Sequence, residues 1–189
     1  MSDKPYFHPK ALVDFKGSIG NRTRVWAFAH VMKGAMVGED CNIGDHAFIE
    51  KGSFLGNRVT VKNGVSVWEK VTLEDDVFIG PNAVFTNDLW PVSRKRDNLL
   101  PTNVRQGACI GANATILCGL EVGRYAFVGA GAVVTKNVPD HALMVGNPAQ
   151  LKGYLCRCRK KLSFKKGSAS CVCGSKFKMS KNKVVPAVR

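Results

Sequence analysis

Residues 43–67, IGDHAFIEKGSFLGNRVTVKNGVSV, repeat one pattern every six residues. A branched apolar anchor opens each hexapeptide, and a small or β-branched residue follows four positions later. The same phase extends back to Val13 and forward to Phe85, stops across residues 86–103, and resumes from Val104 to Val134. An internal repeat this strict indicates a chain built from stacked structural units.

The period of six fits neither an α-helix nor a simple alternating strand. It predicts a short strand, a corner and another short strand, so that three hexapeptides close one coil and every eighteenth residue stacks on its predecessor. The anchors would fill the interior, and the glycine that often follows an anchor would serve a tight corner. We therefore expect an all-β solenoid, a parallel β-helix of about six or seven coils spaced roughly 4.8 Å apart, with residues 86–103 as an inserted loop.

Charge divides the chain near residue 150. The 189 residues carry a net charge of +14, but residues 1–150 hold all 14 acidic residues and 16 basic ones, a net +2, whereas residues 151–189 hold 12 basic residues and no acid. A hydrophobic content of 45% excludes disorder for most of the chain. Only two phenylalanines follow Tyr154. This is a thin platform for base stacking, so we do not expect a nucleic-acid partner.

The N-terminus, MSDKPYFHPK, does not resemble a signal peptide. No run of the chain approaches the roughly 18 apolar residues that a transmembrane segment needs. The chain has seven cysteines, which without a secretory signal favour thiols or metal ligation over disulfides. We therefore expect a cytoplasmic protein without a transmembrane segment.

The basic tail contains two cysteine pairs, Cys156 with Cys158 and Cys171 with Cys173, each followed four residues later by an apolar residue. Two such pairs predict a four-cysteine zinc ribbon, although the usual knuckle is C-x-x-C and each pair here is C-x-C. The alternative is free thiols on a flexible tail. We place the domain boundary after residue 153, with a β-helix domain at 1–153 and a zinc-ribbon-like tail at 154–189.

The repeat resembles that of the hexapeptide acyltransferases, and the resemblance covers residues 5–155. Its most specific part is IGANATILCGLEVGRYAFVGAGAVVTKNVPDHALMVGNPAQ, residues 110–150, which looks like the acetyl-CoA-binding segment of that superfamily and contains its G-N-P-A signature. The segments VWAFAHV (25–31), NGVSVWEKVTLEDDVFIGP (63–81) and VFTND (84–88) are similar to nucleotide-sugar 3-N-acetyltransferases. The resemblance implies a left-handed β-helix, a homotrimer, acetyl-CoA as cosubstrate, and a UDP- or dTDP-linked amino sugar as acceptor in lipopolysaccharide or other surface-glycan biosynthesis.

The start of the inserted loop distinguishes two acetyl acceptors. Many O-acetyltransferases of the resembled superfamily carry a catalytic histidine here in a Thr-x-His-Pro setting, but this chain has Thr86, Asn87 and Asp88. A hydroxyl nucleophile needs a base, whereas an amine whose pKa lies near roughly 7.7–8.0 is partly neutral at pH 7 and attacks a thioester directly. The loop therefore favours an N-acetyltransferase. A sugar O-acetyltransferase and a non-catalytic trimeric scaffold remain the alternatives.

Steps of eighteen residues place Lys51, Glu69 and Asn87 in one column of the solenoid, beside Trp68 and Thr86. We expect Asn87, with Asp88, to position the sugar amine, and Glu69 to bond a sugar hydroxyl or to orient Asn87. The alternatives are an Asx turn at Asn87 and an ordinary exposed glutamate at Glu69.

Four residues are candidate substrate contacts. Trp26 and Trp68 point outward in this register, where each could stack on a base or sugar or could line a subunit interface. His46 is a candidate substrate contact. Arg94, in the loop WPVSRKRDN at residues 90–98, could bind a pyrophosphate, although a charged loop is often only solvated.

The resemblance also implies where acetyl-CoA would bind, because similar enzymes hold the pantetheine arm in a groove between two subunits. The corresponding corners here contain Gly111, Ala112, Gly129 and Ala130, whose small side chains permit a close approach to the backbone. Lys136, with Arg105 or Lys152, is the candidate ligand of the 3′-phosphate.

Overall fold

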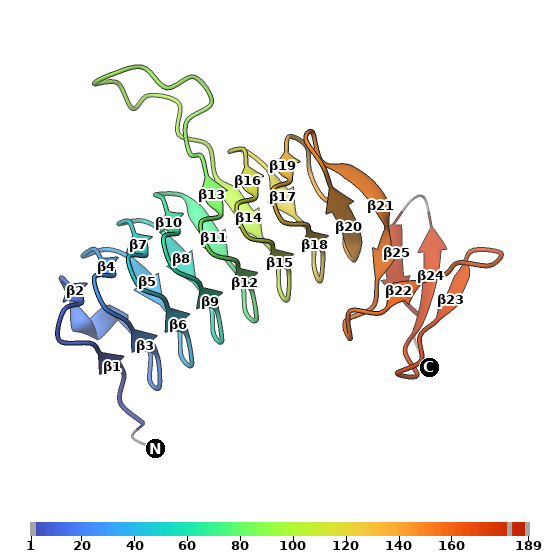
Figure 1. Ribbon diagram of the computed structural model, residues 1–189, viewed down its shortest axis with the longest axis horizontal. Coiled ribbons are helices and arrows are strands. Elements are labelled where there is room, and N and C mark those ends of the chain that lie inside the picture. The colour runs from blue at the N-terminus through green and yellow to red at the C-terminus, as the bar shows by residue number, and fades with distance from the viewer. Residues whose placement is uncertain (1–2, 181–182, 188–189) are drawn as a thin grey trace.

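The chain folds into a three-sided parallel β-helix that ends in a small antiparallel unit (Figure 1). The computed structural model describes residues 3–180 and 183–187. Its regular structure within these ranges is β-strand, apart from one short 3₁₀ helix, η1 (Lys16–Ser18). The predicted all-β solenoid is therefore confirmed.

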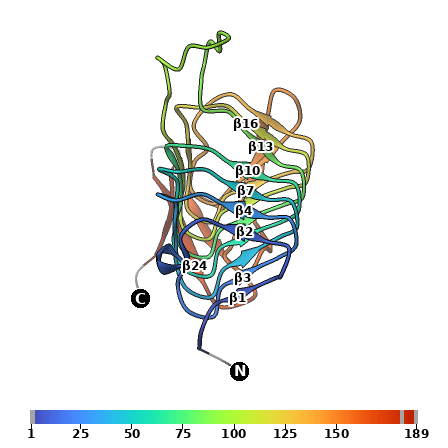
Figure 2. The same ribbon diagram turned by 90° about the vertical axis from the view of Figure 1, so that its left-hand side faces the viewer.

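Each side of the β-helix is a parallel sheet of very short strands, and we number the three faces in chain order. Face 1 contains β1 (Tyr6–Phe7), β3 (Arg24–Val25), β6 (Asn42–Ile43), β9 (Thr60–Val61), β12 (Phe78–Ile79), β15 (Cys109–Ile110), β18 (Phe127–Val128) and β20 (Ala142–Val145). Face 2 contains β2 (Leu12–Val13), β4 (His30–Val31), β7 (Phe48–Ile49), β10 (Ser66–Val67), β13 (Val84–Phe85), β16 (Thr115–Ile116) and β19 (Val133–Val134). Face 3 contains β5 (Met36–Val37), β8 (Phe54–Leu55), β11 (Val71–Leu73), β14 (Thr102–Val104) and β17 (Glu121–Val122). The chain turns at three edges, which we call edge 1–2, edge 2–3 and edge 3–1 (Figure 2).

The strand register confirms the period of eighteen. Val25 pairs with Ile43, and Ile43 pairs with Val61. These anchors are fully buried, as are the alanines four positions after an anchor, such as Ala29. Filling the interior with branched side chains at one phase is what makes the coils stack, because each strand is too short to be stable alone.

Face 1 has eight parallel strands, one more than the upper end of the predicted coil number. The last of them, β20, was not visible in the repeat because Phe127 pairs with Leu143, an offset of sixteen residues rather than eighteen. The first, β1, precedes Val13 but keeps the phase of the repeat, since Phe7 pairs with Val25. Only the C-terminal end of the solenoid therefore departs from the hexapeptide rule, as a terminal repeat commonly does.

The glycine after an anchor does not serve the corner in the way we expected. The left-handed backbone conformation falls three positions after an anchor, for example at Phe28, His46 and Asp76. Gly111 is required for a different reason: a Cβ atom there would lie 2.5 Å from the backbone nitrogen of Ala130 in the next coil. Its lack of a side chain allows two coils to approach each other.

The inserted loop leaves the β-helix after β13 and returns at β14, so it spans residues 86–101 rather than 86–103 (Figure 1). Across the loop, paired residues are more than eighteen positions apart, since Phe78 pairs with Cys109. The base of the loop is a narrow antiparallel stalk, in which Asp88 bridges to Leu99 and the Leu100 N–H donates to the Asn87 carbonyl at 2.9 Å.

The tail is attached to face 1 by a continuous strand. β21 (Gln150–Leu155) runs antiparallel to β20 and crosses the predicted boundary after residue 153, and β22 (Lys161–Leu162) pairs with β21. A second sheet follows, formed by β23 (Ser168–Ser170), β24 (Lys176–Ser180) and β25 (Lys183–Pro186). Among the described residues this small sheet pairs with no strand of the β-helix. Residues 181–182 and 188–189 of the predicted tail lie outside the described residues.

Candidate active site

The base of the inserted loop lies on edge 2–3, where the predicted catalytic residues meet. Ser66 of β10 pairs with Val84 of β13, so Glu69 and Asn87 occupy adjacent rungs. Strands in such a sheet are roughly 4.8 Å apart, which lets both side chains reach one ligand atom. The predicted column of Glu69 and Asn87 is thus present in the fold, and their chemical roles remain predictions.

Asn87 and Asp88 are both half-buried, but they differ in what their side chains do. The Asp88 carboxylate accepts the backbone N–H of Trp90 at 3.0 Å, an Asx turn that shapes the loop. Among the described residues, the Asn87 side-chain amide has no hydrogen-bond partner. The Asx turn that we considered for Asn87 therefore belongs to Asp88, and the Asn87 amide remains available to a ligand.

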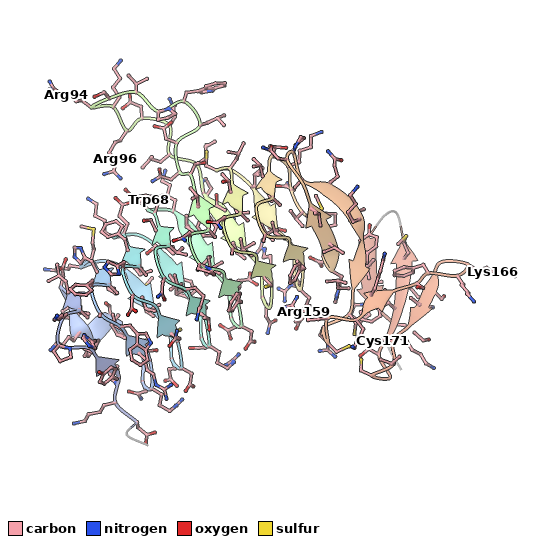
Figure 3. All side chains as sticks on the ribbon, in the orientation of Figure 1. Trp68, Arg94, Arg96, Arg159, Lys166 and Cys171 are labelled. Atoms are coloured by element: carbon pink, nitrogen blue, oxygen red, sulfur yellow. The ribbon has the colours of Figure 1, made fainter. Side chains whose placement is uncertain are left out.

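Glu50 is a member of this site that the sequence analysis missed. Its side chain is only 11% exposed, and one carboxylate oxygen accepts the backbone N–H of Glu69 at 2.8 Å. The other oxygen accepts a guanidinium N–H of Arg96 at 3.0 Å, and the same Arg96 nitrogen lies 3.5 Å from Glu69. Figure 3 shows Arg96 directed from the loop toward the coils near Trp68. Glu50 stands eighteen residues before Trp68, so the column arithmetic could have found it.

Further hydrogen bonds fix the loop base to the β-helix. The Trp68 indole N–H donates to the Phe85 carbonyl at 2.8 Å, and the ring lies 5.6 Å from that of Phe48. The Thr86 hydroxyl accepts the backbone N–H of Cys118 at 2.9 Å. The indole N–H, the only polar group of the Trp68 side chain, is already hydrogen-bonded. This half-buried ring can therefore contact a ligand only by stacking through its face.

The other candidate substrate contacts lie away from the loop base of the same chain. Trp26 and His46 are on edge 1–2, where Trp26 donates to Asn42 at 2.8 Å and His46 stacks on Phe28 at 4.9 Å. Arg94 is exposed at the tip of the loop, pointing outward (Figure 3). Of the four candidates, the structure brings only Trp68 to Asn87 within one chain.

The candidate acetyl-CoA residues are distributed over three edges. Ile110 pairs with Val128, so Gly111, Ala112, Gly129 and Ala130 adjoin on edge 1–2 as predicted. Lys136 is exposed on edge 2–3, two rungs beyond Asn87 and roughly 10 Å from it along the axis. Lys152 is exposed on β21.

Arg105 occupies edge 3–1 and is already paired. Its guanidinium bonds Glu121 and lies 2.8 Å from a carboxylate oxygen of Glu74. Hydrogen bonds to Glu121 and Glu74 raise the pKa of Arg105. A phosphate would have to displace two carboxylates, so we do not retain Arg105 as a phosphate ligand.

The four tail cysteines converge at one point, as the sequence predicts. Their Sγ atoms all lie within 4.8 Å of one another, with Cys156 and Cys173 at 3.5 Å and Cys158 and Cys171 at 3.4 Å. These separations are far longer than the roughly 2.05 Å of a disulfide bond. Hydrogen bonds with the side chain and backbone of Ser175 lower the pKa of Cys173 to about 6, whereas burial raises the pKa of Cys156. A backbone hydrogen bond lowers the pKa of Cys171, but burial and hydrogen bonds with neighbouring thiols outweigh it and raise that pKa to about 12. Because thiolates are the form that ligates metals, a metal here would have to displace protons from the other thiols.

The fold and the edge 2–3 site define a class, the hexapeptide-repeat parallel β-helix. A family model described as "Bacterial transferase hexapeptide (six repeats)" matches residues 17–51, and one described as "Hexapeptide repeat of succinyl-transferase" matches residues 103–136. The chain is 51% identical over 178 residues to the dTDP-3-amino-3,6-dideoxy-alpha-D-galactopyranose 3-N-acetyltransferase of Aneurinibacillus thermoaerophilus, covering 94% of this chain and 92% of that protein. The protein belongs to the hexapeptide-repeat acyltransferase family, which confirms the predicted family and the enzyme class.

More distant relatives share the fold. The bifunctional protein GlmU of Aquifex aeolicus is 31% identical over 76% of this chain, which spans only 29% of that protein. A mutant of GDP-perosamine N-acetyl transferase from Caulobacter crescentus, solved with CoA and GDP-perosamine, superposes with a TM-score of 0.60 at 23% identity. The acetyltransferase domain of PglB from Neisseria gonorrhoeae, solved with acetyl coenzyme A, gives 0.55 at 25% identity. The two alignments cover 81% and 80% of this chain and 58% of each solved chain.

Within residues 3–180 and 183–187, no helix has the length and apolar character that crossing a membrane requires.

Proposed function

We propose that the protein transfers an acetyl group from acetyl-CoA to the 3-amino group of a nucleotide-linked amino sugar. The observation that carries this proposal is the 51% identity, over nearly the whole of both chains, to an enzyme named for that reaction on a dTDP-linked 3-amino-3,6-dideoxyhexose. This relative favours dTDP over UDP and a deoxyhexose over a uronate. The asparagine at the loop start supports an amine acceptor over a hydroxyl acceptor.

The chemistry requires few groups from the protein. The neutral amine attacks the thioester carbonyl carbon, the C–S bond breaks as the tetrahedral intermediate collapses, and the amine proton passes to the departing CoA sulfur. The unpaired Asn87 amide is suited to hold the amine in line with the carbonyl. Asp88 would act by shaping the loop around Asn87, and Glu69 would accept a sugar hydroxyl.

We further propose a homotrimer, because the candidate acetyl-CoA residues and Asn87 lie on different edges of one chain. The acetyl-CoA candidates Gly111 and Ala130 lie on edge 1–2, whereas Asn87 lies on edge 2–3, one face away. Six residues of extended chain separate neighbouring edges, a span of up to roughly 20 Å. A cyclic trimer would bring edge 1–2 of one subunit to edge 2–3 of the next, which would also place Trp26 and His46 near a loop base.

A cytoplasmic location and a role in surface-glycan biosynthesis, lipopolysaccharide among the candidates, complete this proposal. Thioesters of CoA and nucleotide sugars are intracellular metabolites, and all seven cysteines are free, as expected in a reducing compartment. We also propose that Cys156, Cys158, Cys171 and Cys173 hold a structural zinc ion, since tetrahedral Zn–S bonds of about 2.3 Å place sulfur atoms about 3.8 Å apart. The observed separations are near that value.

The test is a substrate panel. Acetyl-CoA is incubated with the protein and with dTDP- and UDP-linked 3-amino sugars and their 3-hydroxy counterparts, and CoA thiol release is followed. We expect release with the amino sugars alone. Release with the hydroxy sugars alone would identify an O-acetyltransferase, and no release with any acceptor would favour the scaffold.

A further inference from the structure

The cysteine cluster is built from two turns with the same backbone. The Cys156 N–H donates to the Lys160 carbonyl at 2.9 Å, and the Arg159 N–H donates to the Cys156 carbonyl at 2.8 Å. The second turn repeats both bonds, from Cys171 to Ser175 at 2.8 Å and from Gly174 to Cys171 at 2.9 Å. The third residue after the first cysteine has a left-handed conformation in each turn, with φ of 67° at Arg159 and 86° at Gly174. We call these turns knuckle 1 (156–160) and knuckle 2 (171–175).

The two knuckles belong to different parts of the molecule. Knuckle 1 connects β21 to β22, which extend the sheet of face 1. Knuckle 2 connects β23 to β24 in the separate small sheet. An ion held by all four cysteines would therefore cross-link the β-helix to the small sheet.

Knuckle 1 is held against edge 3–1 of the β-helix. The Arg159 guanidinium donates to the Gly107 carbonyl at 2.9 Å and to the Tyr125 carbonyl at 3.4 Å. The neighbouring Arg157 guanidinium lies 5.8 Å from the Tyr125 ring centroid. Figure 3 shows Arg159 near Cys171 at the junction of the two parts.

The small sheet has little core of its own. Its strands and knuckle contribute the buried side chains Ala169, Cys171, Phe177 and Val184. Phe177 contacts the β-helix through the ring of His141, which is 5.1 Å away and is itself stacked on Tyr125. A unit of this size without a larger apolar core commonly needs a metal or a disulfide to become ordered.

The charge of the region also favours an anionic cluster. Residues 151–189 contain 12 basic side chains and no acid, and Arg157, Arg159, Lys160 and Lys176 stand in or beside the knuckles. Four thiolates around one Zn²⁺ carry a net charge of 2−, whereas four protonated thiols carry none. The metal-loaded cluster would thus be stabilised by the surrounding cations.

We propose that the zinc ion locks the tail onto the end of the β-helix, holding knuckle 1 on edge 3–1 and the small sheet over His141. This inference rests on the proposed zinc ion but not on acetyl transfer. In the locked state β21 also covers the open edge of β20, a strand edge that would otherwise be free to pair with another chain.

Metal content and hydrogen exchange of the full chain test the lock. We expect one zinc per chain in the wild type and in Cys109→Ser, whose cysteine lies on β15 outside the cluster, and none in Cys158→Ser. Stripping the wild type with a thiol-reactive reagent and a chelator should accelerate amide exchange at least tenfold in residues 156–180 and at Tyr125 and His141. Exchange in β4 to β11 should not change.

Cobalt provides a readout that does not need a variant to fold. Reconstitution of the stripped wild type with Co²⁺ should give the visible absorption and sulfur-to-cobalt charge transfer of a tetrahedral tetrathiolate, and it should restore slow exchange. Substoichiometric zinc together with no cobalt spectrum would overturn the site. A loaded site whose removal leaves exchange at Tyr125 and His141 unchanged would overturn the lock, whatever the outcome for acetyl transfer.

Discussion

At the scale of single residues, the position of Asn87 depends on contacts made by its neighbours. The loop above it is mostly exposed, so polar contacts rather than an apolar core hold it in place. Glu50 makes two of them, one to the Glu69 backbone and one to Arg96. A hydrogen bond between an almost buried carboxylate and a guanidinium is strong, because both groups are charged.

Glu50→Gln should therefore loosen the loop without breaking the coil. The amide still accepts the Glu69 N–H but loses the charge that attracts Arg96. We expect the KM for the amino sugar to rise by roughly tenfold, about 1.4 kcal/mol, with little change in the KM for acetyl-CoA. Arg96→Met is the matched variant and should behave alike. An unchanged KM in both variants, measured by steady-state kinetics, would remove this pair from the site.

Direct attack by the amine predicts how the rate depends on pH. kcat/KM should rise with pH through the pKa of the free substrate amine, roughly 7.7–8.0, and then level off, because no enzyme base has to ionise. Asn87→Ala should lower kcat by about a hundredfold, as expected for a positioning group, without moving that midpoint. A midpoint that shifts with the Asn87 substitution would instead indicate that a group of the enzyme, and not the free substrate amine alone, determines the pH dependence.

At the scale of elements, neighbouring coils on edge 1–2 approach so closely that adding one methyl group should have different effects at Gly111 and at Gly129. A Cβ at Gly111 would lie 2.5 Å from the Ala130 nitrogen, which is backbone and cannot rotate away. A Cβ at Gly129 would lie 3.3 Å from Val145 Cγ2, the end of an exposed side chain that can move.

Gly111→Ala should consequently cost about 1–3 kcal/mol in the free energy of unfolding, and Gly129→Ala should cost less than about 1 kcal/mol. Urea unfolding followed by circular dichroism compares the two. Equal losses would mean that the glycines serve the turn rather than the approach of the coils.

The same elements show how far the sequence alone could go. One phase of apolar anchors was enough to predict the faces, the register and the adjacency of Glu69 and Asn87, because a fixed period leaves one way to stack the coils. The handedness of the helix could not be derived, since a six-residue period suits either hand. The Arg96–Glu50 contact was not predictable either, because a loop outside the period can return to any edge. The six-residue period also predicts that Lys136 and Gly111 lie on different edges. The candidate acetyl-CoA residues were chosen from the family resemblance, without using their positions in the columns.

At the scale of the whole molecule, the tail and the proposed active edge are separate. The cysteine cluster lies on the side of edge 3–1, whereas the inserted loop projects from edge 2–3 (Figures 1 and 2). The net charge of +12 on residues 151–189 therefore belongs to the tail, whereas the proposed site lies on the nearly neutral β-helix.

A site shared between subunits predicts complementation. Asn87→Ala should inactivate the half of the proposed site on edge 2–3. Ala130→Trp should block the half on edge 1–2, because Ala130 is exposed there and its side chain can be enlarged without entering the core. An intact interface needs Asn87 from one subunit and Ala130 from its neighbour, and each residue is intact in half of the chains. Mixed trimers refolded from equal amounts of the two variants should therefore regain about a quarter of wild-type activity. Trimers that form but stay inactive would place the whole site within one chain.

The most direct measurement is acetyl transfer itself. Wild-type protein is supplied with acetyl-CoA and the dTDP-linked 3-amino-3,6-dideoxyhexose, and the product is analysed by mass spectrometry while thiol release is followed. The account predicts one acetyl group on the 3-nitrogen for each thiol released, and no transfer to the 3-hydroxy sugar. Acetylation of an oxygen, or the absence of any acetylated sugar with folded protein, would contradict it.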